Sequence, residues 1–232
     1  MKQFKIRCSA ISQIMAQPRA KKDKEAGLLG DTAKTYCQTW LKEQLYKRRK
    51  EFGSKQTEKG TIVEEQSLDY LINNNILPFA LKNETFFEND YLTGTPDVIS
   101  SECVVDLKNS WDAFSFPLFE QEITNKAYYY QLQGYMCLTG LKKAKLIYIL
   151  SNTPAEFVEQ EIYYATKDKV LSISETKAIH DKIKNYHNYD RFNSNLRVKQ
   201  FEIEYNIDAV EQIYLQVEKC RNYIYKLLTN IK

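Results

Sequence analysis

The sequence predicts an α/β fold with a mixed central β-sheet flanked by helices, and three observations support this fold class. Residues 103–108 and 145–150 are short apolar runs that are typical of buried strands. Residues 60–73 and 126–139 carry their apolar side chains at helical spacing. Helical and strand patterns therefore follow one another along this part of the chain, as they do in α/β domains.

The chain has 232 residues, enough for one large domain, and its seven Gly and five Pro indicate no long flexible linker. We expect one domain over residues 1–232, with a core at about 55–152, N-terminal helices at 7–50 and an extension without recognisable motif at 153–232. Further helices are expected at 9–16, 31–50, 174–188 and from 208 onward, and further strands at 84–88, 95–99 and 199–205. Ser9, Asp31 and Asp208 are the expected N-caps, and Gly140 is the expected C-cap.

Composition excludes several classes of protein and site. The five cysteines are odd in number and form no C-x-x-C pair, which argues against a disulfide framework and against zinc or iron–sulfur sites. His180 and His187 lack nearby ligand partners, so we interpret them as surface or core residues. No run approaches the roughly 18 apolar residues of a membrane span, and the N-terminus lacks the apolar region of a signal peptide. We expect a cytoplasmic protein with no membrane contact.

The formal net charge of +3 is too small to identify a nucleic-acid-binding protein by itself. Lysines and arginines nevertheless gather at residues 21–24, 47–50 and 142–145. Each group could neutralise phosphates or be an ordinary solvated surface.

The most informative stretch is residues 93–108, where two strands are expected around a Ser-Ser-Glu turn at 100–102. Asp97 lies in the first strand and Asp106 in the second, and Lys108 shares a face with Asp106 because strand side chains alternate. An isolated D-x-K on an exposed strand would be ordinary surface. This second strand is apolar enough to be buried, and buried strands do not carry an unpaired Asp and Lys without a reason. Paired carboxylates bind Mg²⁺ or Mn²⁺, and a neighbouring lysine can position or deprotonate a water, so the stretch indicates phosphodiester hydrolysis.

Pro96-Asp97 followed by Asp106-Leu107-Lys108 resembles the PD-(D/E)XK nucleases. The wider match, over residues 7–150, most resembles the phage lambda exonuclease-like or YqaJ-type recombination nucleases. The resemblance implies a restriction-endonuclease-like core and a Mg²⁺ site, with Mn²⁺ able to substitute, held by Asp97, Asp106 and the Leu107 carbonyl. The second acid is Asp instead of the commoner Glu, so its side chain is one methylene shorter.

Two helices add residues to this resemblance. Gly60 followed four residues later by Glu64 matches a family helix that supplies a further acid at the metal, with Glu65 as the alternative. Gln131 and Tyr135 match the family's Q-x-x-x-Y element. The resemblance implies that Gln131 orients Lys108 or the phosphate, since an amide both donates and accepts hydrogen bonds, and that Tyr135 contacts DNA.

The N-terminal helix and an aromatic segment allow two interpretations each. In the family, a serine-led helix ending in Pro-Arg contacts DNA, which implies that Ser9 holds a 5′ phosphate and Arg19 grips the duplex end. The alternative is a helix cap and a surface arginine. Trp111, Phe114 and Phe116 could stack on a frayed strand, but we favour burial in the core or a subunit interface.

The predicted function is a Mg²⁺-dependent exonuclease that digests duplex DNA, 5′-to-3′, in phage-type recombination or DNA processing. A single-strand annealing protein and a ring-shaped homotrimer are the partners implied by analogy. One alternative is a structure-specific or restriction-like endonuclease. The other is a non-catalytic DNA-binding recombination accessory protein, against which the set of Asp97, Asp106, Lys108 and Gln131 argues.

Overall fold

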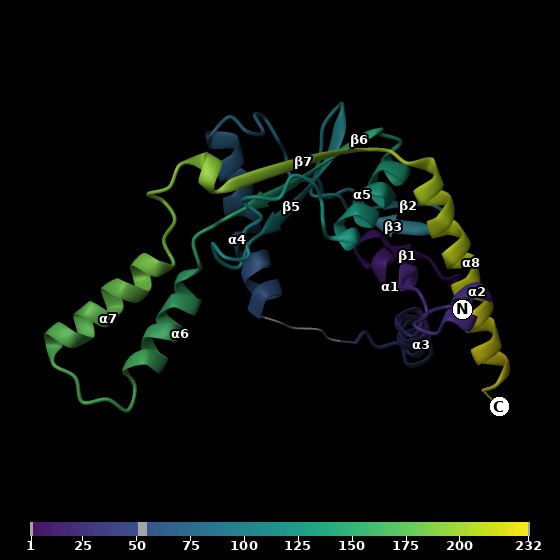
Figure 1. Cartoon of the computed structure of the whole chain (residues 1–232), viewed down its shortest axis with the longest axis horizontal. Coiled ribbons are helices and arrows are strands. Elements are labelled where there is room, and N and C mark those ends of the chain that lie inside the picture. Colours follow the sequence, from purple (N-terminus) through teal and green to yellow (C-terminus); the bar gives the residue numbers. More distant parts are fainter. Residues whose placement is uncertain (1, 51–54, 232) are drawn as a thin grey trace.

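A computed structural model describes residues 2–50 and 55–231, with side chains from residue 63 onward in the second range. Two mixed β-sheets form the centre of the molecule (Figure 1). In the smaller sheet, β3 (Leu92–Gly94) lies between β1 (Ile6–Arg7), which is parallel to it, and β2 (Phe87–Glu88), which is antiparallel. The larger sheet has the order β4 (Val98–Ile99), β5 (Cys103–Asn109), β6 (Lys143–Ile149) and β7 (Val198–Glu204), and only β5 and β6 are parallel. The predicted α/β class with mixed sheets and flanking helices is confirmed.

The helices surround these sheets and also extend beyond them. One side holds α5 (Lys126–Thr139), α8 (Ile207–Thr229), α3 (Asp31–Tyr46) and α1 (Ile11–Met15), which follows the 3-10 turn η1 (Cys8–Ala10). Helix α4 (Lys55–Asn73) packs on β5. In Figure 1, α6 (Ala155–Thr166) and α7 (Ile173–Tyr186) form a hairpin that projects away from the sheets. The shorter helices are α2 (Lys21–Glu25) and η2 (Ser194–Leu196).

The alternation of side chains along β5 divides the core in two. Val104 packs with Leu132 and Met136 of α5 in the larger apolar cluster. Val105 and Leu107 pack instead with α4 in a second cluster. Because side chains alternate along a strand, Asp106 and Lys108 share the α5 face, while Asn109 lies on the α4 face. The two faces of one strand therefore serve two different environments.

Several predicted bounds and caps were wrong. Strand β4 begins only at Val98, because Pro96 has no N–H for the ladder and the Asp97 carbonyl accepts a hydrogen bond from the Asn83 N–H instead. Ser9 caps no helix, and Asp31 lies in the first turn of α3 after an N-cap at Gly30.

At the other ends, α3 stops at Tyr46, where Lys47 adopts positive φ, so residues 48–50 lie outside the helix. Asn206, in place of Asp208, caps α8. Gly140 at φ 78° is the C-cap of α5, as predicted. None of the described helices is long and apolar enough to cross a membrane.

Candidate active site

Strand β5 holds Asp106 and Lys108 side by side beneath α5. Asp106 is 1% exposed, and its Oδ2 lies 2.5 Å from Lys108 Nζ. The Lys108 ammonium also lies 5.2 Å from the centre of the Tyr128 ring, within range of a cation–π contact. The prediction that Asp106 and Lys108 share a face of the strand is therefore confirmed. Asp106 is buried, and Lys108 is half-buried.

Gln131 of α5 fixes the other oxygen of Asp106. Its Nε2 donates to Asp106 Oδ1 at 2.8 Å and to the Tyr135 hydroxyl at 3.0 Å. The amide thus contacts the acid, where the sequence had suggested Lys108 or phosphate. Tyr135 is only 5% exposed, and its hydroxyl accepts a hydrogen bond from the Gln131 amide. Its contact with DNA stays a prediction.

Two glycines allow α5 to approach closely enough for these bonds. A Cβ on Gly134 would lie 2.8 Å from both Cys8 Sγ and Ile11 Cδ1, and a Cβ on Gly94 would lie 2.8 Å from Tyr135 Cε1. Such distances are shorter than van der Waals contact, so any larger residue would push the N-terminal segment or β3 away from α5. The close packing ties the position of Gln131 to the segment that carries Ser9.

Asp97 lies at the open edge of β5, just before β4. Its Oδ2 accepts a hydrogen bond from the Leu107 N–H at 2.7 Å. The N–H and C=O of one residue in an extended strand point to the same side, so the Leu107 carbonyl also faces this edge. Asn83 holds the turn from outside: its N–H donates to the Asp97 carbonyl at 2.8 Å, and its Nδ2 donates to the Pro96 carbonyl at 2.9 Å.

Asp97 and Asp106 are buried acids whose negative charge Lys108 compensates only in part. Burial, together with the nearby Asp106 carboxylate, raises the pKa of Asp97 to about 7, against the opposing effects of the Leu107 N–H and Lys108. Burial also raises the pKa of Asp106, although Lys108 opposes it. Burial alone would lower the pKa of Lys108, but the Asp106 carboxylate outweighs it and the pKa is raised. Clustered, perturbed acids of this kind are typical of functional sites.

Glu64 of α4 adds a third carboxylate. It acts electrostatically on both Asp97 and Asp106, which distinguishes it from the exposed Glu65. Its Oε1 lies 3.1 Å from Lys82 Nζ. Neither Lys82 nor Asn83 was a predicted site residue, and no local pattern in their irregular stretch marks them. Gly60, in the same helix, lies among the residues whose side-chain surroundings are not described.

The oxygen donors fit a hard divalent cation. Asp106 Oδ2 is buried and, among the described residues, makes no hydrogen bond beyond its close contact with Lys108. Asp97 lies near enough for the Asp106 carboxylate to act on it, and the Leu107 carbonyl faces the same strand edge as Asp97. Mg²⁺ is commonly held by only one or two carboxylates together with waters and substrate oxygens. Across the described ranges no three His, Cys, Asp or Glu side chains already stand together as a metal cage, and Glu64 is instead paired with Lys82.

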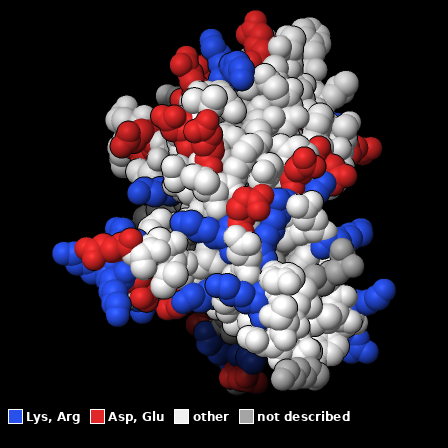
Figure 2. Space-filling model, turned by 90° about the vertical axis from the view of Figure 1, so that its right-hand side faces the viewer, with Lys and Arg blue, Asp and Glu red and all other residues white. Residues whose placement is uncertain are grey.

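The N-terminal residues border a broad basic groove with a volume of about 1580 Å³. Ser9 is exposed and lines it together with Thr93, whereas the exposed Arg19 does not. The cations of the lining are Lys2, Lys5, Arg7, Lys47, Arg48, Arg49 and Lys50. On the face shown in Figure 2, Lys and Arg gather mainly over the lower half and Asp and Glu mainly over the upper half.

The aromatic segment after β5 divides between the two interpretations. Phe116 is 6% exposed and packs with Leu150 and Tyr189, so its burial is confirmed. Phe114 is 87% exposed, so it is not part of the core of this chain, and its burial in a subunit interface stays a prediction. Trp111 is half-buried.

His187 takes part in helix packing, and the cysteines, all of which the structure describes, form no disulfide. His187 contacts Glu161 at 2.8 Å and Thr153 at 3.0 Å, so it links α7 to α6 and the preceding loop. All five cysteines are free, and four of them are buried.

Comparisons with known proteins agree with this fold. No protein-family model matches the chain, and no curated protein sequence matches it significantly. The chain is 28% identical to a phage-related exonuclease from Haemophilus somnus 129PT, with a TM-score of 0.77 over 100% of this chain and 98% of the other. The alkaline exonuclease LHK-Exo from Laribacter hongkongensis is 12% identical with a TM-score of 0.62, over 97% of this chain and 90% of the other. The structure of LHK-Exo in complex with dAMP is also 12% identical in sequence, with a TM-score of 0.64. The likeness to exonucleases supports the nuclease resemblance of the sequence.

Proposed function

We propose that this protein is a Mg²⁺-dependent exonuclease that hydrolyses the phosphodiester bonds of duplex DNA. The observation that carries the proposal is the buried Asp106, held between Gln131 and Lys108 with Asp97 beside it. A purely structural role would not require two acids with raised pKa values at one strand edge. The full-length likeness to a phage-related exonuclease supports the reaction class.

Each residue has a definite task in this reaction. Asp97, Asp106 and the Leu107 carbonyl would hold Mg²⁺, which when bound polarises the phosphate and lowers the pKa of a water. Gln131 keeps the Asp106 carboxylate oriented. Because the pKa of Lys108 is raised, its side chain is charged at neutral pH and acts as a hydrogen-bond donor that positions the water and offsets the charge developing on the phosphate.

The groove beside Ser9 supports DNA as the substrate. Its seven Lys and Arg side chains exceed the three acids in the lining, Asp31, Glu43 and Glu88, and phosphate backbones are attracted to such an excess. The complex of LHK-Exo with dAMP, a deoxyribonucleotide, points to the same substrate class. The 5′-to-3′ direction, Ser9 as the 5′-phosphate contact, Arg19 as a second DNA contact, a ring-shaped oligomer and an annealing partner belong to the same proposal through the sequence resemblance.

The test uses linear duplex labelled at either its 5′ or its 3′ end, and closed circular plasmid, in a Mg²⁺ titration of wild type and Lys108→Ala. We expect loss of the 5′ label first, an untouched circle, and no cleavage by the variant. Cutting of the circle would move the assignment to an endonuclease, since a circle has no end. No cleavage with any divalent metal would favour the DNA-binding accessory protein.

A further inference from the structure

Lys82 is a cation at the candidate site that the proposed reaction does not use. Its ammonium contacts Glu64 Oε1 at 3.1 Å. Glu64 is the main cause of the raised pKa of Lys82, and Glu65 and Asp97 add to it. The lysine therefore sits within the field of the same acids that the metal would join.

The chain holds Lys82 in this place through the turn that carries Asp97. Lys82 forms an isolated antiparallel bridge with Val98, the first residue of β4. The next residue, Asn83, donates to the Asp97 carbonyl through its backbone and to the Pro96 carbonyl through its side chain. Lys82 and Asp97 are thus fixed to each other by backbone contacts, which a chance surface pair would not require.

The charges explain why a cation is needed there. The Glu64 carboxylate lies near enough to act electrostatically on Asp97 and Asp106, and Lys108 is committed to Asp106 at 2.5 Å. Lys82 supplies the second positive charge. It is the more displaceable of the two lysines, because its side chain is 43% exposed against 23% for Lys108.

We propose that Lys82 is a stand-in cation, which neutralises Glu64 in the metal-free protein and competes with the divalent metal for that carboxylate. The inference rests on the proposed function, because it takes the metal site beside Asp97 and Asp106 as given. Glu64 becomes a metal ligand, directly or through a water, only when its contact with the ammonium is broken. This contact accounts for the absence of a ready-made three-acid cage among the described residues.

Competition gives removal of Lys82 two effects of opposite sign. Without metal, loss of the ammonium leaves three carboxylates facing one lysine, so the protein becomes less stable. With metal, the loss removes both the competitor for Glu64 and a like charge close to the cation, so binding tightens. Removal of an ordinary surface lysine would change neither the stability nor the metal affinity appreciably.

The experiment is a calorimetric titration of the full chain with Mn²⁺ in the absence of DNA, combined with thermal unfolding in EDTA and in Mn²⁺. Lys82→Met removes the charge and keeps the apolar stem. Lys145→Met is the matched control. Lys145 forms a similar ion pair with Glu202, with 2.8 Å between Lys145 Nζ and Glu202 Oε1, and this pair lies outside the candidate site. We expect Lys82→Met to bind Mn²⁺ about five- to tenfold more tightly, to melt lower than wild type in EDTA, and to gain more in Tm from Mn²⁺. Lys145→Met should match wild type in Mn²⁺ affinity.

A Glu64→Gln background identifies the mechanism. If Lys82 competes for Glu64, Lys82→Met tightens binding much less once the carboxylate is gone, because only the relief of like-charge repulsion remains. Tightening of undiminished size in Glu64→Gln would show a general field effect and overturn the proposal, as would equal or weaker binding by Lys82→Met. No Mn²⁺ binding by any variant would overturn the metal site and the proposed function with it, whereas equal binding by wild type and Lys82→Met removes only the role of Lys82.

Discussion

The two faces of β5 carry buried polar side chains that are partnered in very different ways. On the α5 face, Asp106 and Lys108 form a charged pair to which Asp97 and Glu64 add unbalanced negative charge. On the α4 face, one residue further along, Asn109 Oδ1 accepts hydrogen bonds from Ser67 at 2.6 Å and Ser151 at 2.8 Å. The neutral groups on the second face are hydrogen-bonded to one another, whereas Asp106 Oδ2 on the first face makes no hydrogen bond beyond its ion pair with Lys108.

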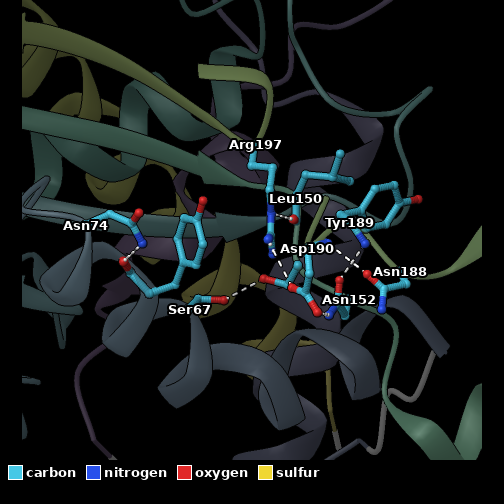
Figure 3. Close-up of polar contacts among 10 residues, drawn as sticks. Ser67, Asn74, Leu150, Asn152, Asn188, Tyr189, Asp190 and Arg197 are labelled. Atoms are coloured by element: carbon cyan, nitrogen blue, oxygen red, sulfur yellow. Dashed lines mark hydrogen bonds and ion pairs between the residues drawn. The ribbon is translucent and has the colours of Figure 1, made fainter. Parts of the chain in front are cut away.

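Next to this face, a second hydrogen-bonded network is centred on the Arg197–Asp190 ion pair and lies at the base of the α6–α7 hairpin (Figure 3). Arg197, which is 5% exposed, donates to the Leu150 carbonyl at 3.2 Å and to Asp190 at 3.1 Å, and its guanidinium lies 4.5 Å from the Tyr70 ring centre. Asn152 donates to the second oxygen of Asp190 at 2.8 Å and accepts from the Tyr189 N–H at 2.7 Å. The contacts of Tyr189 and Asp190 join the segment after α7 to Asn152 and Arg197, which lie close to the ends of β6 and β7, and the Tyr70 contact adds α4.

The difference separates polar groups that stabilise the fold from polar groups kept for chemistry. Buried groups with complete hydrogen bonding rigidify a structure, whereas incompletely compensated acids store unfavourable energy that a ligand can release. Substitutions should therefore reduce activity on one face and stability on the other.

The largest expected effect is on activity at the charged face. Asp106→Asn should reduce Mg²⁺-dependent hydrolysis of linear duplex about 10³-fold or more, because it removes a metal-ligating charge while keeping an acceptor for Gln131. The rate is measured by release of end label at saturating Mg²⁺. Thermal unfolding in EDTA provides the control, and there Asp106→Asn should melt no lower than wild type. Wild-type activity in Asp106→Asn would remove this residue from the reaction.

The next effect is on stability, in the network around Arg197 next to the α4 face. Arg197→Met should lower the free energy of unfolding by about 2–4 kcal/mol, since it removes two hydrogen bonds and leaves the Leu150 carbonyl without that partner. For a chain of this size the Tm should fall by roughly 5–15 °C. Arg191→Met is the control, because Arg191 is exposed and contacts the Phe192 ring, so its change should stay within about 0.5 kcal/mol. Loss of hydrolysis by folded Arg197→Met at 25 °C would contradict the separation of the two faces.

The sequence predicted the parts of this comparison that depend on local pattern. Strand alternation placed Asp106 and Lys108 together, and the helix at residues 126–139 was predicted with its observed bounds. Helix α6 was missed, although Pro154 at its start and Glu156 in its first turn are recognisable helix-start signals.

The partners of the site residues depend on tertiary structure and could not be predicted. Gln131 reaches Asp106 because Gly134 and Gly94 let α5 approach, and no local pattern reports that distance. Lys82 and Asn83 lie in an irregular stretch. They become part of the site only through their backbone contacts with Val98 and Asp97, which the sequence does not report. The unmatched charge at the site is likewise a property of the assembled fold.

The surplus of negative charge at the site should also make stability depend on pH, through the raised pKa of Asp97. Its pKa is raised to about 7 in the folded protein and lies near 4 when unfolded. A raised carboxyl pKa stabilises the fold below the unfolded pKa, and this contribution is lost as pH rises from about 4 to 7. In EDTA, Asp97→Asn should therefore be more stable than wild type at pH 8 by about 1–2 kcal/mol, and this advantage should shrink toward pH 5. Thermal unfolding at both pH values measures the difference, and a less stable Asp97→Asn at pH 8 would contradict the charge surplus.

The smallest effect tests whether the neutral face is a satisfied network. Ser67→Ala or Ser151→Ala alone should cost about 1 kcal/mol or less, because the remaining serine still donates to Asn109 Oδ1. The double variant leaves that oxygen without either donor, so its loss should exceed the sum of the two single losses by about 1 kcal/mol. Denaturant unfolding of the four proteins closes the cycle. Simple additivity would mean that Asn109 gains a replacement partner such as water, and the α4 face would then be less dry than the apolar cluster of Val105 and Leu107 implies.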